Sequence, residues 1–180
     1  PMPKYLNYTG KIIESYRPDG LSRVAILESN EFYFYRLDPP SLDEHEKTQT
    51  ENVLKTLAYN LTPKMIVEAE TLKNYLENMG LNEIQIYDVM SKVQGYSWLD
   101  PLIKDNKLED IHCFKPDVPL RVVHSDYGLL VTNIIPNRRE VDAMVRLLAY
   151  RGGSSISLFK PIRDFSYFCL LKTGAALTCR

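Results

Sequence analysis

The chain has few cysteines and no pattern of metal-binding residues. Its three cysteines, Cys113, Cys169 and Cys179, are an odd number and form no Cys-x-x-Cys pair. We therefore expect reduced, buried thiols rather than disulfides. The histidines do not share helical spacing, and His112 and Cys113 would point to opposite faces of a strand. The sequence predicts no metal site.

Long apolar runs are also missing. The longest late run, from Phe165 to Leu171, is far too short to span a bilayer and is followed by Lys172. The first residues, Pro1 to Tyr5, lack the apolar stretch of a signal peptide. We therefore expect a cytoplasmic protein whose natural start is Met2.

The common catalytic and nucleotide-binding motifs are absent from the sequence. The one Gly-Lys pair, Gly10-Lys11, is followed by Ile12 and does not belong to a phosphate-binding loop. Acidic residues gather at Asp100, Asp105, Glu109 and Asp110, but Asp100 precedes a proline and is typical of a turn or cap. We expect these carboxylates to be structural, and the chain by itself not to be an enzyme.

Charge is balanced overall and uneven along the chain. The net charge is −1, which removes the simplest electrostatic case for a protein that coats nucleic acid. From Asn137 onward, eight basic residues face three acidic ones. A basic edge suits phosphates or an acidic partner, but solvated arginines explain it equally well. The basic residues are Arg138, Arg139, Arg146, Arg151, Lys160, Arg163, Lys172 and Arg180.

The first forty residues are typical of strands. Residues 11–16, 21–29 and 31–37 are rich in Ile, Val, Tyr and Phe, with turn residues between them. Phe32 and Phe34 should face one side of the last strand, and Tyr33 and Tyr35 the other. A tyrosine face can stack on bases, but without a basic stripe around it burial under a helix is favoured.

Helical patterns follow between residues 41 and 94. Ser41 and Glu44 have the spacing of a capping box, and Thr62-Pro63 should cap and begin a second helix. Gly80 is a natural helix stop, and a third helix should run from Asn82 to Val93. We give the acidic run Asp43, Glu44 and Glu46 no function. The pattern predicts a small three-helix bundle.

The remaining sequence predicts short strands around one helix. Residues 108–114, 120–124 and 129–132 should be strands, a helix should begin after Asn137, and residues 154–159 and 165–171 should form a final strand pair. The predicted class is α+β. Its domains are residues 1–94, with strands and a three-helix bundle, and residues 95–180, a small α/β domain with an antiparallel sheet.

A family resemblance begins at Gly95. The stretch Gly-Tyr-Ser-Trp-Leu-Asp-Pro-Leu is followed by Asp105 and then by Glu-Asp-Ile-His-Cys at residues 109–113. Val-Pro, Val-His, Tyr-Gly and Thr-Asn pairs follow at residues 118, 123, 127 and 132. In order and spacing, this resembles the amino-terminal region of archaeal secretion-superfamily ATPases, the motors of archaella, type IV pili and type II secretion. The motif positions are Gly95, Tyr96, Asp100, Pro101, Leu102, Glu109, Asp110 and Cys113.

The resemblance implies a non-catalytic regulatory and assembly region. In that family it sits on the rim of a hexameric ring, moves against the motor domain and contacts the membrane platform protein. That places it in the cytoplasm, at the inner face of the membrane. The chain would need no cofactor, whereas ATP and Mg²⁺ would bind the later motor domain of a full-length parent. The candidates to face that domain or its nucleotide are Arg138, Arg139, Arg146, Arg151, Arg163 and Lys172.

Two other functions stay open. One is a stand-alone adaptor of the same machinery that has lost the motor and binds a membrane or pilus partner through its helices. The other is a nucleic-acid binder that uses Tyr33, Tyr35 and the basic tail. The family's Pro-Asp-Gly-x-Arg turn, whose arginine approaches the nucleotide, is not found after Asp164.

Overall fold

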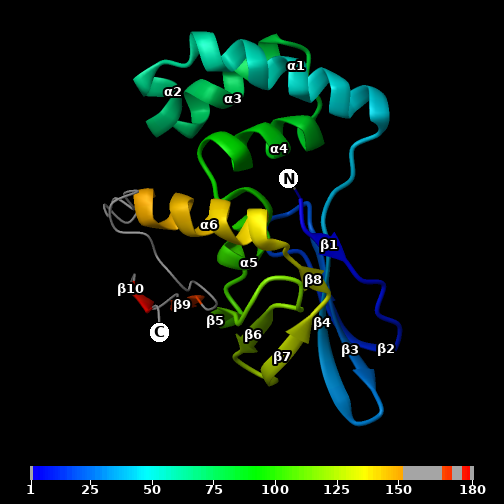
Figure 1. The fold of residues 1–180 in the computed structure, drawn as a ribbon. Coiled ribbons are helices and arrows are strands. Elements are labelled where there is room, and N and C mark those ends of the chain that lie inside the picture. Colours follow the sequence, from blue (N-terminus) through cyan, green and yellow to red (C-terminus); the bar gives the residue numbers. More distant parts are fainter. Residues whose placement is uncertain (1, 152–167, 172–175, 179–180) are drawn as a thin grey trace. The chain divides into compact units, whose positions relative to one another are not determined.

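The computed structural model describes residues 2–151, 168–171 and 176–178 (Figure 1). The chain forms two compact units, one of residues 1–39 with 101–180 and the other of residues 40–100. The second unit is helical and is inserted between two parts of the first, which contains the sheet. This grouping differs from the expected boundary at residue 94, because strands before and after the insertion pair in one sheet.

The sheet unit contains one mixed sheet. Among the described residues its strand order is β10-β9-β5-β6-β7-β4-β3-β2. Neighbours are antiparallel except β4 and β7, which are parallel. The strands are β2 Lys11–Tyr16, β3 Arg23–Ser29, β4 Phe32–Asp38, β5 Leu108–Cys113, β6 Arg121–His124, β7 Gly128–Thr132, β9 Phe168–Leu171 and β10 Ala176–Thr178. A separate antiparallel pair joins β1 Lys4–Tyr5 to β8 Ile134–Ile135.

The predicted α+β class is confirmed, and six of the expected strands agree closely with β2 to β7. The strands of residues 95–180 pair antiparallel with one another, as expected. They do not form a sheet of their own, because β4 joins β7 in parallel and makes the whole sheet mixed. The expected strand at residues 154–159, and the first three residues of the one at 165–171, lie outside the described residues.

One face of the sheet, which we call the inner face, is the core of this unit. Because paired residues share a face, the register assigns the inner face in each strand. Its buried members include Val24, Ile26, Tyr35, Leu37, Ile111, Cys113, Val122, His124 and Leu130. The alternation of Phe32 and Phe34 against Tyr33 and Tyr35 is confirmed. Tyr35 is fully buried, as favoured, whereas Tyr33 is 40% exposed.

The side chain of Asn133 continues the hydrogen bonding of β4 at the point where β7 ends. Its Oδ1 accepts a hydrogen bond from the Leu37 amide at 2.8 Å, and its Nδ2 donates to the Leu37 carbonyl at 3.0 Å. The same Nδ2 donates to the carbonyl of Leu6 at 3.1 Å, and the Leu6 amide donates to the Asn133 carbonyl at 2.8 Å. One buried side chain therefore ties the N-terminal segment and β4 to the end of β7.

The helical unit has four α-helices between residues 44 and 93, where three were expected. They are α1 Glu44–Asn60, α2 Pro63–Val67, α3 Ala69–Asn78 and α4 Glu83–Val93. The expected second helix divides at Glu68, whose backbone is extended. Gly80 has the left-handed φ of 76° that favours glycine. The core of the unit is Val53, Leu57, Leu72, Leu76, Leu81, Ile86 and Val89.

Helix starts were predicted closely, with one wrong cap. Thr62 caps α2 with Pro63 at its first position, as the pattern indicated. The expected third helix begins one residue later than predicted, because Asn82 is its cap, with Gln85 as the reciprocal partner. The capping box of α1 is Asp43 with Glu46, not Ser41 with Glu44. Both pairs have the required spacing, and aspartate caps as well as serine does, so the overlapping patterns could not be separated locally.

Two shorter helices and one long one complete the described chain. They are the 3₁₀ turn η1 Ser97–Leu99, the short α5 Asp100–Lys104 and α6 Arg138–Arg151. Within the described ranges, no helix is both long and apolar enough to cross a membrane.

Removing the side-chain amide of Asn133 should destabilise the sheet unit. We expect Asn133→Ala to lower the free energy of unfolding by about 3–5 kcal/mol, because Leu37 would keep a buried amide and carbonyl without partners. Urea denaturation followed by circular dichroism measures the change. Asn7→Ala is the matched control, since Asn7 is exposed in the same unit, and it should change stability by less than about 0.5 kcal/mol. Equal effects of both variants would contradict this role.

Candidate functional site

The start of the family-like motif is a tightly packed turn. The Asp100 carboxylate, only 3% exposed, accepts a hydrogen bond from the Tyr96 amide at 2.7 Å. A Cβ added to Gly95 would lie 2.2 Å from Asp100 Oδ2, which is far inside van der Waals contact. A larger residue at this position would displace the buried Asp100 carboxylate, so the Gly-Tyr-x-x-x-Asp spacing has a structural explanation. The expected turn or cap role of Asp100 is confirmed.

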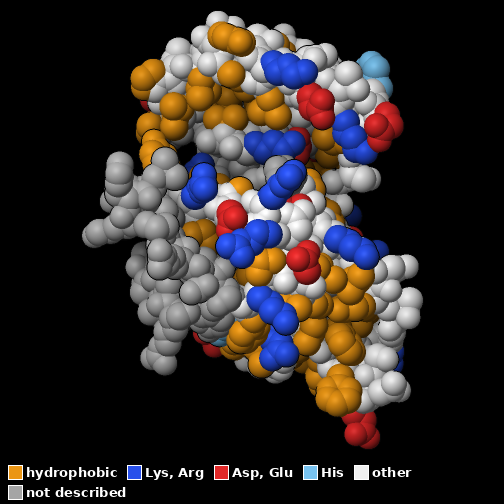
Figure 2. All heavy atoms as spheres, viewed as in Figure 1, with side chains coloured by type: hydrophobic (Ala, Val, Ile, Leu, Met, Phe, Trp, Pro, Cys, Tyr) orange, Lys and Arg blue, Asp and Glu red, His pale blue; other side chains and the backbone are white. Residues whose placement is uncertain are grey.

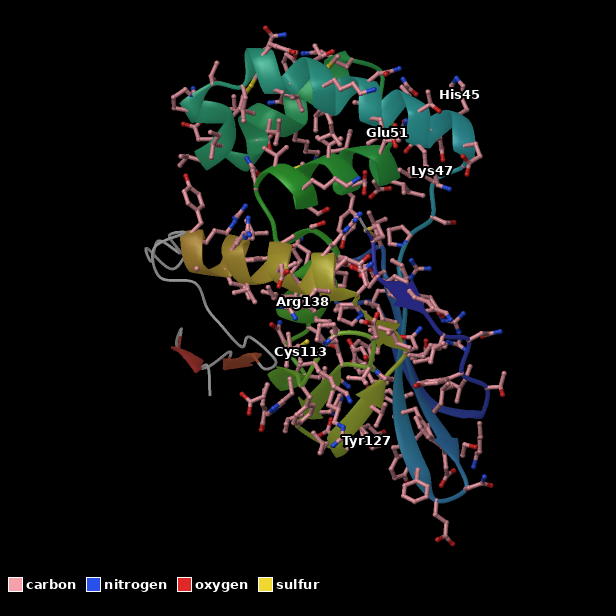
Figure 3. All side chains as sticks on the ribbon, in the orientation of Figure 1. His45, Lys47, Glu51, Cys113, Tyr127 and Arg138 are labelled. Atoms are coloured by element: carbon pink, nitrogen blue, oxygen red, sulfur yellow. The ribbon has the colours of Figure 1, made fainter. Side chains whose placement is uncertain are left out.

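The rest of the motif is largely structural as well. Pro101 and Leu102 are buried in α5, and Cys113 is buried at the end of β5 (Figure 3). Burial raises the pKa of the Cys113 thiol to about 12, so it is not a reactive thiolate at neutral pH. Glu109 is exposed and Asp110 is half-buried on the same strand. Cys113 is a free thiol, as expected.

Four of the six basic residues named as candidates to face a motor domain or its nucleotide lie on the surface of helix α6. Asn137 caps it, accepting from the Glu140 amide at 3.1 Å while the Asn137 amide donates to Glu140 Oε2 at 2.6 Å. Helical spacing puts Arg139 and Arg146 opposite the buried stripe, and Arg138 beside them pairs with Asp142 (Figure 3). The exposed residues are Arg138, Arg139, Arg146 and Arg151, whereas Arg163 and Lys172 lie outside the described residues.

A buried polar network on the inner face was not predicted. Asp105, which follows α5 and is 1% exposed, accepts hydrogen bonds at Oδ2 from Tyr16 at 2.8 Å and from Tyr35 at 2.7 Å. Its Oδ1 accepts from the Lys107 amide at 2.9 Å. Burial, followed by the Asp105 interactions, raises the pKa of both tyrosines, so both hydroxyls stay protonated as donors. The carboxylate of Asp105 thus joins β2, β4 and the loop before β5.

His124 extends the network to β6. It is 1% exposed, its Nδ1 accepts from the Asp126 amide at 3.1 Å, and its Nε2 lies 3.4 Å from Tyr16 Oη. Because the Tyr16 hydroxyl donates to Asp105, its oxygen is left to accept, which assigns the proton of neutral His124 to Nε2. Burial lowers the pKa of His124, and this outweighs the opposing effect of nearby Asp105, Asp126 and Glu14.

Charged residues surround the exposed edge of this network. Lys107 forms an ion pair with Glu14, which raises the Lys107 pKa and lowers that of Glu14, and its ammonium lies 4.8 Å from the centre of the Tyr16 ring. Tyr127, on the β6–β7 turn (Figure 3), packs its ring 5.1 Å from that of His124 and 5.5 Å from that of Tyr33. The rim therefore combines one ion pair with aromatic rings that pack at a tilt to one another.

These residues include one set of possible metal ligands. Single ligand atoms of Glu14, His124 and Asp126 lie within 4.8 Å of one another. In the structure, however, both ring nitrogens of His124 have hydrogen-bond partners, and Glu14 is paired with Lys107. Binding an ion there would break these contacts, so the arrangement is explained as a polar network.

Sequence reasoning missed Tyr16, Asp105 and His124 as one cluster. One sequence feature could have pointed to such a cluster. Tyr35 lies on a strand face expected to be buried, and a buried tyrosine hydroxyl needs a hydrogen-bond partner. The sequence does not say which of the many carboxylates supplies it, because Asp105 is 70 residues away from Tyr35. The nucleic-acid-binding hypothesis loses one of its two tyrosines, since Tyr35 is buried and cannot stack on a base.

Removing one donor to the buried carboxylate should be costly. We expect Tyr35→Phe to lower the free energy of unfolding by about 1.5–3 kcal/mol, the range for hydrogen bonds to charged groups. Tyr33→Phe is the matched control, because Tyr33 is exposed on the same strand, and it should change stability by under about 0.5 kcal/mol. Chemical denaturation measures both, and a Tyr35→Phe protein as stable as wild type would show that the network contributes nothing.

Stability should fall in mild acid because of His124. The folded state holds its pKa below the usual value, so the unfolded state binds more protons as the pH drops below about 6.5. We expect His124→Asn to lose less stability than wild type between pH 7.5 and pH 5.5, measured by thermal unfolding. His45→Gln, a change at the exposed surface of α1, should keep the wild-type loss. A His124→Asn profile parallel to wild type would refute the assignment.

Comparisons with known proteins identify two relatives and no family. No known protein-family profile matches the chain. The uncharacterized protein MJ1288 of Methanocaldococcus jannaschii is 34% identical over 131 residues, which are 72% of this chain and 48% of that protein. The uncharacterized protein MJ0781 of the same archaeon is 22% identical over 165 residues, 85% of this chain and 23% of that protein. The chain thus spans about half the length of one relative and about a quarter of the other.

Proposed function

We propose that this chain is a non-catalytic regulatory and assembly region of a hexameric ATPase of the secretion, pilus or archaellum type. It moves against a motor domain and contacts a membrane platform protein at the inner face of the membrane. ATP and Mg²⁺ belong to the motor domain, and this region needs no cofactor of its own. Similarity to stretches of two longer proteins supports the view that such a region forms part of larger chains.

The structural use of the motif residues agrees with this proposal. Asp100, Leu102 and Cys113 are buried and Gly95 closes a turn, so these positions build the fold rather than a catalytic centre. In the proposal, the sheet unit with α6 is the part equivalent to the family's small α/β domain. The helices of residues 40–100 are the equivalent of its leading bundle.

The exposed arginine face of α6 is the observation that carries the proposal. Arg139 and Arg146 lie on one side of the helix and have no ion pair within the described part of the chain. A guanidinium fork binds carboxylate or phosphate with two hydrogen bonds and stays charged at any working pH. This face is therefore suited to an acidic surface of a motor domain or to the edge of its nucleotide.

A specific observation favours the adaptor as second candidate. Residues 40–100 have their own hydrophobic core and carry ten acidic residues against five lysines, with no arginine. A compact acidic helical unit is suited to bind a basic partner of the same machinery. In that case the partner contacts would map to the helical unit and not to α6.

Charge reversal on α6 tests the leading proposal. The probe is a recombinant motor domain of a pilus-type secretion ATPase, and its binding to the chain is measured by calorimetry. We expect Arg139→Glu with Arg146→Glu to weaken binding at least about tenfold, since each charge-assisted hydrogen bond contributes about 1.5–3 kcal/mol. Lys4→Glu with Lys11→Glu is the matched control at exposed positions of the sheet unit, and it should retain the wild-type affinity.

Three results would argue against the proposal. Equal weakening by both double variants would point to non-specific charge attraction. Loss of binding only after charge reversal in residues 40–100 would favour the adaptor. ATP hydrolysis by the chain alone, retained through successive purification steps, would refute a non-catalytic region.

A further inference from the structure

The face of the sheet opposite the core, here the outer face, is apolar, and the described residues leave part of it uncovered. By register it carries Phe34, Arg121, Val123, Leu129 and Val131 as neighbours across β4, β7 and β6. Leu129 is 57% exposed, and Phe32 and Phe114 at its margins are 69% and 40% exposed. Figure 2 shows hydrophobic side chains gathered over these strands, with Lys and Arg side chains beside them.

The sequence of these strands is that of strands covered on both faces. A half-solvated antiparallel strand alternates apolar and polar residues, whereas β7 has Leu129-Leu130-Val131 and β6 has Val122-Val123. Leu130 and Val122 fill the inner face and are buried. The apolar residues between them face outward, so the outer face is not built for water.

The other half of the outer face is already covered by this chain. The Tyr8 ring lies edge-on to Phe34 at 5.3 Å, and the Tyr8 carbonyl accepts from Arg36 at 3.1 Å. A Cβ on Gly10 would be 2.7 Å from the Glu28 carbonyl oxygen, so glycine lets the N-terminal segment lie close to β3. Ala25 and Leu27 beneath it are at most 1% exposed. Within the described ranges this cover ends at β4, and Leu129 of β7 is left 57% exposed.

Arg121 is the basic residue of the uncovered half, and the half-buried Asp110 on β5, the register partner of Val123, is an acidic one. The Arg121 guanidinium lies 5.1 Å from the centre of the Phe114 ring, and that ring stacks on His112 at 6.0 Å. No carboxylate pairs with Arg121 within the described residues, although it is exposed. An arginine held over an aromatic ring beside apolar side chains is the type of residue that dominates binding interfaces.

We propose that the uncovered half of the outer face binds an amphipathic α-helix of a partner protein, with an Asp or Glu of that helix paired to Arg121. A helix is preferred to a strand because helices pack on sheet faces, whereas added strands pair with sheet edges. The apolar side of the helix covers Leu129, Val123 and Val131. This surface is distinct from the arginine face of α6, so it goes beyond the function proposed above.

Site-specific photocrosslinking in the natural host identifies the occupant. Leu129 is replaced by p-benzoylphenylalanine in the full chain, and the crosslinked peptide is identified by mass spectrometry. We expect a single peptide with apolar residues at helical spacing and an acidic residue among them. The same replacement at Tyr59, which is 91% exposed in the helical unit, is the control and should not capture this peptide.

The role of Arg121 is tested in the same assay. Arg121→Glu should lower the crosslinking yield at least about tenfold, as expected for loss of a charge pair and gain of repulsion, and Arg121→Lys should retain part of it. The isolated chain with Leu129→Gln should melt within about 2 °C of wild type, because the changed side chain is exposed. Marked destabilisation would show instead that this chain covers the face itself.

Other outcomes would overturn the proposal. They are crosslinks to a second copy of this chain, crosslinks to lipid, the same peptides at Tyr59, a captured peptide without an acidic residue, and no crosslink at all.

Discussion

The geometry of the sheet unit depends on one buried carboxylate. In the ladder, β2 and β6 are separated by four inter-strand steps, which would be about 19 Å across a flat sheet. Nevertheless, Oη of Tyr16 in β2 lies 3.4 Å from Nε2 of His124 in β6. The hydroxyls of Tyr16 and of Tyr35 in β4 both donate to Asp105. The sheet must therefore curl strongly toward its inner face, and Asp105 gathers the side chains that meet inside the curve.

A buried carboxylate is stabilising only when its oxygens are hydrogen-bonded. Asp105 meets this condition with two hydroxyl donors and the Lys107 amide. The outcome is a polar core that prescribes one arrangement of β2, β4 and the loop before β5, because no other register would bring these donors together. The apolar side chains of β6 and β7 that alternate with this core lie on the opposite, outer face, where the further inference places a partner helix.

Local features were predicted well and distant ones were not. The strand β2 and the cap at Thr62 follow from short patterns, and the structure contains them where they were expected. The parallel pairing of β4 with β7 joins residues about a hundred positions apart, and no local pattern encodes it. The division of the expected second helix at Glu68 likewise depends on packing within its unit.

The candidate site shows the same limit. The sequence predicted that the arginines after Asn137 are candidates to bind a partner, and helical spacing places Arg139 and Arg146 together on the exposed face of α6. The use of Gly95 to clear space for Asp100 was predictable as a turn but not as a contact with that carboxylate. The Tyr16–Asp105–His124 cluster needed the fold, since its members come from three separate segments.

The most direct test of the account is a proton NMR measurement of the tyrosine hydroxyls at neutral pH. If Asp105 holds both donors inside the curled sheet, the hydroxyl protons of Tyr16 and Tyr35 exchange slowly enough with water to be seen as separate resonances, and both are lost in Asp105→Ala. Hydroxyl protons that exchange as fast as that of the exposed Tyr59 would contradict the buried network and the curvature attributed to it.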